Sequence, residues 1–175
     1  MSDITGHEQF RQVMSIFIHK GYRESTVKND IALLSLNTPL QINKFVSPIN
    51  LPSQDQPISG KLRVSGWGRL SSFQGIPDTL QKVEVDMVPD ELCYLLVPAV
   101  QFTPRNSTLC SGMSGNKTSC NGDSGGPAVS IDGGYVAGIV SFRSSRICGQ
   151  KNRPSVSTRV SHYVNWILQQ QAMMA

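Results

Sequence analysis

Apolar and polar residues alternate along much of the chain, which is the pattern of half-buried β-strands. The segment KVEVDMV sets Val83, Val85 and Met87 on one face and charged residues on the other. Residues 61–67, KLRVSGW, alternate in the same way. The short apolar run DIALLSL, residues 30–36, instead predicts a fully buried strand. These patterns predict an all-β chain.

Turn residues divide the pattern further. Residues 128–142, AVSIDGGYVAGIVSF, predict two strands joined at an Asp-Gly-Gly turn. Prolines recur between positions 39 and 89, and residues 48–60 are the best candidate for a linker.

One helix is expected, near the C-terminus. It covers the sequence SHYVNWILQQQA, in which Ser161 is a candidate N-cap. Val164, Ile167 and Leu168 share one face of this helix. No second helix is predicted.

Composition limits the class of protein. The chain has 175 residues, of which 39% are hydrophobic and 16% charged, so it is long enough for one domain and too apolar for a disordered chain. The apolar-rich patch near its start, VMSIFI at 13–18, is much shorter than the ~20 residues of a membrane-spanning helix. No signal peptide is visible in the opening MSDITGHEQF.

The net charge of +4 is unevenly distributed, because the chain from Ser124 onward carries five basic side chains and one acidic side chain, Asp132. A solvated basic surface is the simpler interpretation, and attraction of acidic substrates is the alternative. These basic residues are not interleaved with stacking aromatics, so no nucleic-acid site is expected.

Four cysteines stand at positions 93, 110, 120 and 148, without a Cys-x-x-Cys pair and far from the three histidines. A zinc site is therefore not expected, and no other metal is predicted. Two disulfides fit the even count, with three pairings open from the residues alone. Disulfides imply an oxidising compartment, which conflicts with the lack of a visible signal peptide.

The sequence GDSGG surrounds Ser124 with glycines. A nucleophile elbow needs a helix directly after the serine, and Gly125-Gly126-Pro127 disfavours one. A loop that presents backbone amides is the better interpretation. Gly122 allows an unusual backbone conformation that brings its amide near that of Ser124, and two such amides stabilise a developing oxyanion.

CNGDSGGP resembles the nucleophile signature of the chymotrypsin/trypsin-like serine peptidases, and NDIALLSL resembles their segment with the catalytic aspartate. Further similar segments follow in the family's order: VSGWG, IVSF, CGQKNRPSVSTRV and YVNWI. The resemblance covers almost the whole chain. It implies two packed antiparallel β-barrels, the first incomplete here, and a C-terminal helix.

The resemblance also implies a division of the chain. Residues 1–50 would hold the remaining strands of the first barrel, and 51–60 the linker between barrels. Residues 61–160 would form the second barrel, and 161–175 the C-terminal helix and tail. All four parts belong to one peptidase domain.

By the same resemblance, Ser124 is the nucleophile and Asp30 supports the histidine base. The amides of Gly122 and Ser124 form the oxyanion hole, and the backbone of Ser141 begins the strand against which substrate lies. The family's disulfide pairing corresponds to Cys93–Cys110 and Cys120–Cys148.

The family's histidine precedes its aspartate in an Ala-Ala-His-Cys-like stretch. His7 and His19 precede Asp30 but lack that context, and His162 belongs to the terminal helix. The resemblance thus implies a serine endopeptidase present as a fragment without its catalytic histidine, inactive alone.

The family's activation N-terminus is also not found. It pairs with the carboxylate before the serine, here Asp123, which we expect to be a destabilising buried charge unless it reorients. Two alternatives stay open: a non-catalytic homologue that acts as a binding or regulatory module, and a chain activated by a partner that supplies the front half.

Specificity follows from the pocket positions of the family. Thr118 stands at the pocket floor, where cleavage after Lys or Arg uses an aspartate, so that preference is not expected. Arg143 and Ser155 replace common glycines and narrow the pocket in favour of small residues. The Arg143 guanidinium alternatively pairs with an acidic substrate side chain or points to solvent. Phe142 is a further substrate-binding position.

The remaining expectations concern attachments and surroundings. Asn106 and Asn116 begin N-glycosylation sequons. The expected partners are a polypeptide substrate or a protein inhibitor. No cofactor, membrane, nucleic acid or obligate oligomer is expected, and the location implied by family and disulfides is extracellular.

Overall fold

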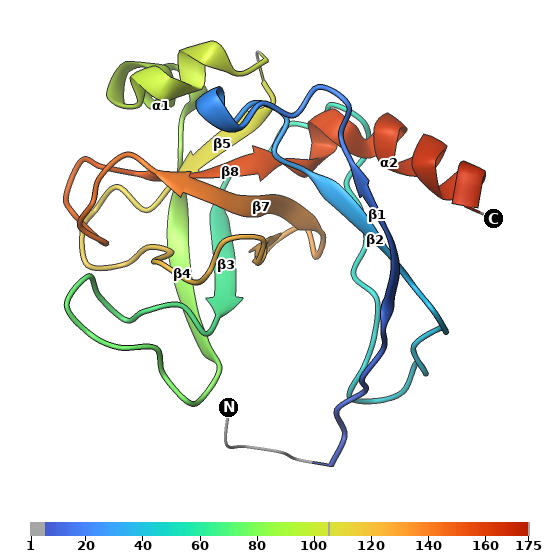
Figure 1. Cartoon of the computed structure of the whole chain (residues 1–175). Helices are drawn as coiled ribbons and strands as arrows, with labels where there is room; N and C mark the ends of the chain where they lie inside the picture. The colour runs from blue at the N-terminus through green and yellow to red at the C-terminus, as the bar shows by residue number, and fades with distance from the viewer. Residues whose placement is uncertain (1–5, 105, 175) are drawn as a thin grey trace.

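Six strands close into an antiparallel β-barrel in the order β3-β4-β5-β8-β7-β6 (Figure 1). The computed structural model describes residues 6–104 and 106–174. The barrel strands are β3 (Lys61–Gly66), β4 (Gln81–Val88), β5 (Thr108–Ser111), β6 (Pro127–Ser130), β7 (Val136–Arg143) and β8 (Ser155–Arg159). The chain is mostly β, with a closed barrel, a second sheet and a C-terminal helix, as the trypsin-like resemblance implied.

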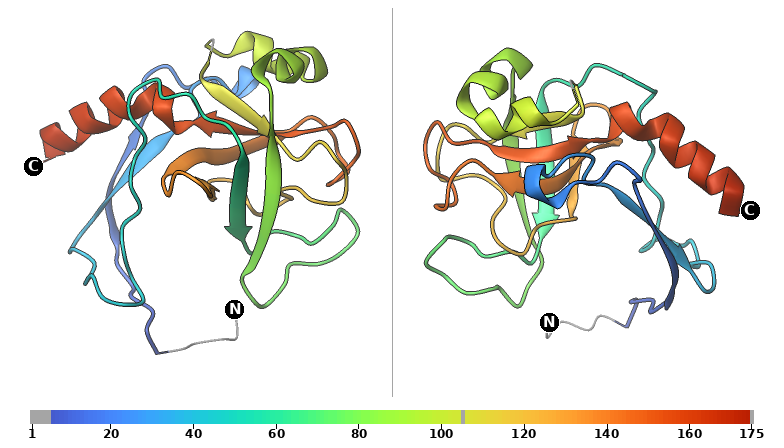
Figure 2. Two further views of the ribbon diagram at one scale, coloured as in Figure 1. Left: turned by 180° about the vertical axis from the view of Figure 1, so that it is seen from behind. Right: turned by 45° about the horizontal axis from the view of Figure 1, so that its top comes forward.

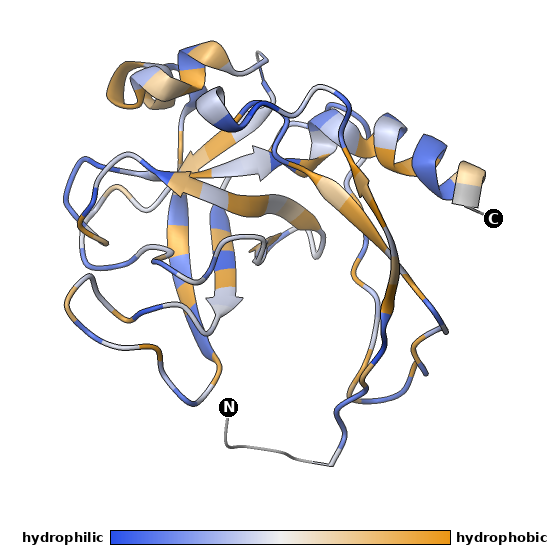
Figure 3. Cartoon of the chain, viewed as in Figure 1, coloured by the Kyte–Doolittle hydropathy of each residue, from blue (hydrophilic) through white to orange (hydrophobic). Residues whose placement is uncertain are grey.

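The alternation seen in the sequence decides which side chains enter the barrel. Leu62, Val64 and Val85 are buried in its core. Their neighbours face solvent, where Lys61 pairs with Asp86 across the two strands at 2.7 Å. The same alternation appears along β4 in Figure 3. Because each strand keeps one apolar face, the barrel buries a continuous interior.

The hairpin predicted for residues 128–142 is present. β6 and β7 pair antiparallel, with Ala128 opposite Gly138. The turn between them is closed by the amides of Ser130 and Gly134, and Gly134 has a positive φ of 62°. This hairpin places the end of β7 beside the glycine-rich loop that precedes β6.

A second, two-stranded sheet stands beside the barrel and consists of β1 (Val13–Ile18) and β2 (Ala32–Leu36) (Figures 1 and 2). The expectation of a fully buried strand at 30–36 was wrong, since the side chain of Leu34 is 58% exposed. An apolar run shows only that neither face of the strand carries charged side chains. It does not show that other residues cover both faces. Within the described residues, nothing covers one face of this sheet.

The C-terminal helix α2 (Val160–Met174) leaves the barrel directly after β8 and runs past the β1–β2 sheet (Figure 2). Its Val160, Tyr163 and Ile167 pack with Ile31 in a small core. Ser161 does not cap it as expected, because its buried hydroxyl has no hydrogen-bond partner among the described residues.

The segment predicted as a linker lies against the start of α2. The Ser161 carbonyl accepts a hydrogen bond from the amide of Asp55 at 2.8 Å. The Gln54 side chain accepts a hydrogen bond from the amide of Asn165, also at 2.8 Å. This segment therefore ties the first two turns of α2 to the chain that leads into the barrel.

The structure contains a helix that the sequence did not predict, α1 (Asp90–Leu96). It is only seven residues long, too short to show a helical period. A disulfide from Cys93 to Cys110 ties it to β5, and Val97 and Val100 pack against the same cluster. Tertiary contacts rather than local preference form this helix. Short 3₁₀ turns at Glu24–Thr26 and Pro98–Phe102 complete the elements.

None of the helices in the described part of the chain is long and apolar enough to span a bilayer.

His19 lies directly after β1 and faces the rings of Tyr163 and Trp166 on α2, at centroid distances of 5.5 and 5.2 Å. Burial, with a smaller contribution from nearby His162, lowers the pKa of His19 below its usual value. As pH falls below about 6.5, the unfolded chain takes up a proton that the folded chain resists. Stability should therefore decrease on acidification until the folded pKa is passed.

Denaturant unfolding at about pH 7.5 and about pH 5 measures this effect. We expect His19→Gln to lose part of the acid-induced decrease in unfolding free energy. The matched control is His7→Gln, because His7 stacks on exposed Phe45 and not on the helix. An unchanged acid response in His19→Gln contradicts the assignment.

Candidate functional site

The Ser124 loop is held against strand β7 by two backbone hydrogen bonds. The amide of Gly125 donates to the Val140 carbonyl at 2.8 Å, and the amide of Val140 donates to the Gly126 carbonyl at 2.9 Å. Ser124 itself is exposed. The rigid flank thus presents a serine hydroxyl to solvent at a fixed place beside β7.

Gly122 occupies a position that only glycine fits. Its φ of +100° is unfavourable for residues with a Cβ, and an added Cβ would lie 3.1 Å from the Cα of Gly68. The backbone amides of Gly122 and Ser124 donate no hydrogen bond to any other described residue. Both donors are therefore available to a ligand oxygen.

Asp30 reaches the same region through Ser141. The Ser141 hydroxyl donates to the Asp30 carboxylate at 2.6 Å. In the β7–β8 ladder Val140 pairs with Ser157 and Phe142 with Val156, so Ser141 is an extra residue without a partner. This β-bulge is the irregularity that accompanies the contact with Asp30.

Two further contacts fix the backbone around Asp30. Thr158 on β8 donates its hydroxyl to the Asp30 carbonyl at 2.7 Å. The neighbouring Asn29 is buried and accepts a hydrogen bond from the Tyr163 hydroxyl at 2.9 Å. Burial raises the pKa of Tyr163, against the opposing effect of a hydrogen bond with Ser107, so the phenol remains a donor.

A cavity of about 420 Å³ opens at this junction. Its lining residues come from the Ser124 loop, from the end of β7 and from the loop that follows: Ser119, Cys120, Asn121, Ser124, Val140, Ser141, Phe142, Arg143, Ser144, Ser145 and Arg146. Four of the predicted site residues, Ser124, Ser141, Phe142 and Arg143, therefore share one cavity. Asp30 joins them through the Ser141 hydrogen bond.

Thr118 and Ser155 do not line this cavity. Their hydroxyls are hydrogen bonded to each other at 2.6 Å, and Ser155 is buried. Thr118 lines a neighbouring cavity of about 170 Å³ together with Asp123. Thr118 therefore lines a different cavity from Ser124, and Ser155 lines neither of these two cavities.

The Asp123 carboxylate is not left without partners, in contrast to the expectation of an unpaired buried charge. It accepts hydrogen bonds from the amides of Gly68 at 2.9 Å and Cys120 at 2.8 Å. It packs so closely against Gly66 and Gly68 that a Cβ on either would come within 2.3 Å of it. These two amide donors hold the carboxylate in this orientation.

The three histidines are engaged elsewhere. His7 stacks on Phe45, His19 lies against α2, and Nδ1 of His162 is 3.7 Å from Asp55. Within the described part of the chain, none is hydrogen bonded to Asp30 or Ser124. No group of side chains able to hold a metal ion occurs in the described residues either.

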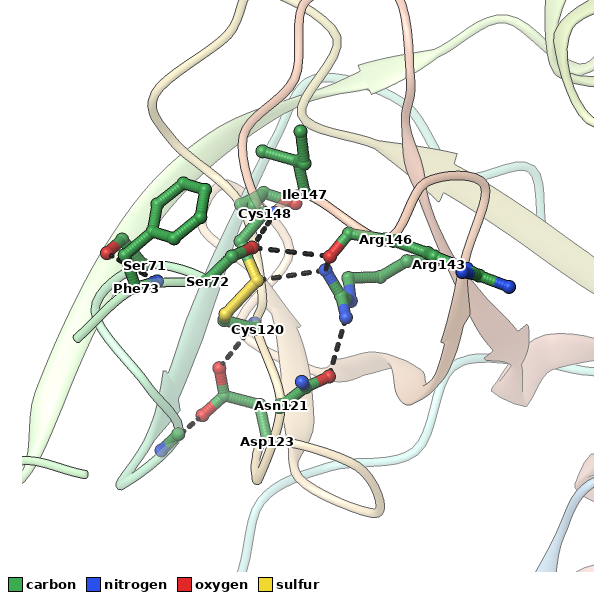
Figure 4. The surroundings of a disulfide bond; sticks show 12 residues. Ser71, Ser72, Phe73, Cys120, Asn121, Asp123, Arg143, Arg146, Ile147 and Cys148 are labelled. Carbon is green, nitrogen blue, oxygen red and sulfur yellow. Dashed lines mark hydrogen bonds between the residues drawn. A yellow bond between two sulfur atoms is a disulfide. The ribbon is translucent and has the colours of Figure 1, made fainter. Parts of the chain in front are cut away.

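Arg143 turns back across the disulfide loop rather than into solvent (Figure 4). Its Nη2 donates to Asn121 Oδ1 at 2.5 Å, and its Nη1 donates to Sγ of Cys148 at 2.9 Å. Cys148 is bonded to Cys120, so both disulfides have the pairing that the resemblance implied. The guanidinium therefore bridges the two loops at the cavity wall.

Sequence reasoning did not identify three residues that shape this site. Asn121 holds Arg143, while Gly66 and Gly68 form the surface on which Asp123 rests. The VSGWG segment contributed to the family resemblance, but it predicted no contact with Asp123. Its glycines have a direct packing role that becomes visible only when residues 55 positions apart meet.

Comparisons with known proteins match most of the chain. A family model described as Trypsin matches residues 2–167. Trypsin-1 of Astacus astacus is 41% identical over 170 residues, covering 95% of this chain and 70% of that protein. Trypsin-3 of Salmo salar is 38% identical, over 93% of this chain and 66% of that protein. Cationic trypsin-3 of Rattus norvegicus is 39% identical, over 95% and 65%. The chain thus spans about two thirds of the length of these relatives.

Proposed function

The chain belongs to the trypsin family of serine peptidases, and from that premise we propose that it forms the nucleophile-bearing part of a serine-type endopeptidase. Ser124 attacks the scissile carbonyl of a polypeptide, and the amides of Gly122 and Ser124 receive the developing oxyanion. One observation carries the proposal: Ser124 opens onto the cavity lined by Ser141, whose hydroxyl is bonded to Asp30.

The reaction needs an imidazole between Asp30 and Ser124. The base takes the proton of the serine hydroxyl as it attacks, and later returns it to the leaving amine. Since none of the chain's own histidines contacts either residue, we propose that residues 1–175 do not hydrolyse peptides by themselves. A histidine from another segment or chain completes the site.

The activation role of Asp123 is also part of the proposal. In the family this carboxylate pairs with a newly formed N-terminal ammonium. Here both oxygens of the Asp123 carboxylate accept hydrogen bonds from the amides of Gly68 and Cys120. An incoming ammonium must therefore share a carboxylate oxygen with one of these amides or displace it. The adjoining cavity of about 170 Å³ provides the space for such a group.

The second candidate function is a non-catalytic homologue that binds polypeptides or protein inhibitors without cleaving them. The positions of the histidines favour it, because a complete cavity without a base still binds an extended chain. The C-terminal end of β7, beyond the residues paired with β6, then serves as the edge to which the partner adds.

A serine-directed fluorophosphonate probe distinguishes these functions. The probe reacts only with an activated hydroxyl, so the purified chain should remain unlabelled, like its Ser124→Ala variant. Addition of a segment that supplies the histidine should produce labelling that Ser124→Ala abolishes. Labelling of the chain alone at Ser124 contradicts the proposed lack of a base. Failure to label after addition of a histidine, with the fold intact, favours the binding module.

The proposal also covers substrate preference, glycosylation and location. Cleavage after Lys or Arg is not expected, because no carboxylate of a described residue lines the cavity of Ser124. Arg143 belongs to the wall of that cavity and narrows it. Asn106 and Asn116 are exposed and remain candidate glycan sites. The two disulfides support an extracellular location.

A further inference from the structure

Among the described residues, two arginines and no acidic residue line the cavity of Ser124. Arg143 and Arg146 both belong to its wall. In the described residues, no Asp or Glu oxygen lies within salt-bridge distance of either guanidinium. Asp123, the acidic residue near this loop, is turned to the amides of Gly68 and Cys120. The wall therefore carries positive charge that the protein itself does not neutralise.

The Arg143 guanidinium is fixed by weak or neutral acceptors. Besides Asn121 Oδ1 and Cys148 Sγ, it contacts the Arg146 carbonyl at 3.4 Å. Thioether and disulfide sulfurs are weak acceptors, and an amide oxygen carries no charge. These contacts hold the Arg143 guanidinium in one orientation but do not neutralise its charge. An ion pair formed there with a ligand therefore costs less side-chain entropy.

Arg146 contributes differently. Its carbonyl accepts from Arg143, while its side chain extends away from the disulfide (Figure 4). Arg146 is exposed and its guanidinium has no partner in the described structure. It therefore adds to the positive potential around the cavity, whereas Arg143 supplies the fixed donor beside it.

We propose that this cavity selects polypeptides with an aspartate or glutamate at the residue whose carbonyl Ser124 faces, and that Arg143 determines this specificity. The inference rests on the proposed function, because it assigns the substrate side chain of that same site. A carboxylate meets a preoriented guanidinium there, and charge-assisted hydrogen bonds of this kind are the strongest available to the wall.

Fluorescence anisotropy with peptides blocked at both ends tests the proposal in the full chain. Two labelled peptides differ only in Asp against Asn at the central position. We expect the Asp peptide to bind at least about tenfold more tightly at low salt, with the preference decreasing as salt rises. Arg143→Gln should remove the preference, and Arg143→Lys should retain part of it. If the chain cleaves the peptides, the same ratio is measured in kcat/KM.

Several controls separate the possible failures. Arg153→Gln removes one exposed positive charge outside the cavity and should leave the preference unchanged. If Arg143→Gln unfolds, Arg146→Gln should still reduce the preference. An Asn peptide with a free C-terminal carboxylate tests whether a chain end is the ligand instead, and binding equal to the Asp peptide overturns the side-chain assignment.

Equal binding of Asp and Asn peptides overturns the inference but leaves the proposed function intact. No binding of any peptide, together with no probe labelling after a histidine is supplied, contradicts the proposed function itself. The two results are therefore distinguishable.

Discussion

Replacing Asp30 by asparagine should reduce kcat about ten-thousand-fold in a form of the protein that has a histidine base, as it does in serine peptidases whose triads have been dissected. The carboxylate stabilises the imidazolium that forms when Ser124 attacks, and an amide supplies neither the charge nor the correct tautomer. Folding should be little affected, since Asn is isosteric and Thr158 still donates to the residue's carbonyl.

The measurement requires a complete site. A chimera supplies it, in which a segment with the family's Ala-Ala-His-Cys stretch is placed before Met1. Asp132→Asn is the matched control, because Asp132 is an exposed turn residue, and its kcat should stay within about twofold. Ser141→Ala should cost about tenfold or less, since it removes one hydrogen bond to Asp30. A chimera whose kcat survives Asp30→Asn contradicts the role of Asp30.

Replacing Leu109 by alanine should lower the free energy of unfolding by about 3–5 kcal/mol. Leu109 is fully buried inside the barrel among Leu62, Val64 and Val85. Removal of its side chain loses apolar burial and leaves a cavity that a closed barrel cannot collapse to fill.

Urea or guanidinium unfolding with both disulfides intact measures this loss. Leu95→Ala is the matched control, because Leu95 on α1 is 78% exposed, and it should change stability by about 0.5 kcal/mol or less. Equal effects of the two substitutions contradict the assignment of the barrel interior as the main core.

The barrel was predictable because its strands keep a strict alternation that local sequence displays. KLRVSGW and KVEVDMV each place one apolar face inward, and the Asp-Gly-Gly turn fixes the β6–β7 pair. The burial of β2 was not predictable, because an apolar run does not reveal what covers it. The helix α1 depends on a disulfide and on packing beyond its own seven residues.

Only the parts of the candidate site that lie in recognisable sequence motifs were predictable. The segment around Ser124 and the segment with Asp30 identified the family and its expected roles. The orientation of Asp123 was not predictable, because its donors include an amide 55 residues earlier in the chain. The position of Arg143 likewise depends on Asn121 and Cys148, to which no local pattern connects it.

Because of the bulge at Ser141, the number of residues at this end of β7 limits sequence change more than the type of each residue does. Gly138 and Ile139 follow the regular ladder, and Phe142 and Arg143 resume it one residue out of step. Loss of a single residue from this stretch would either remove the bulge, and with it the contact of Ser141 to Asp30, or shift the pairing with β8 by one residue. The protein should therefore tolerate substitutions in this strand far better than the deletion of a residue.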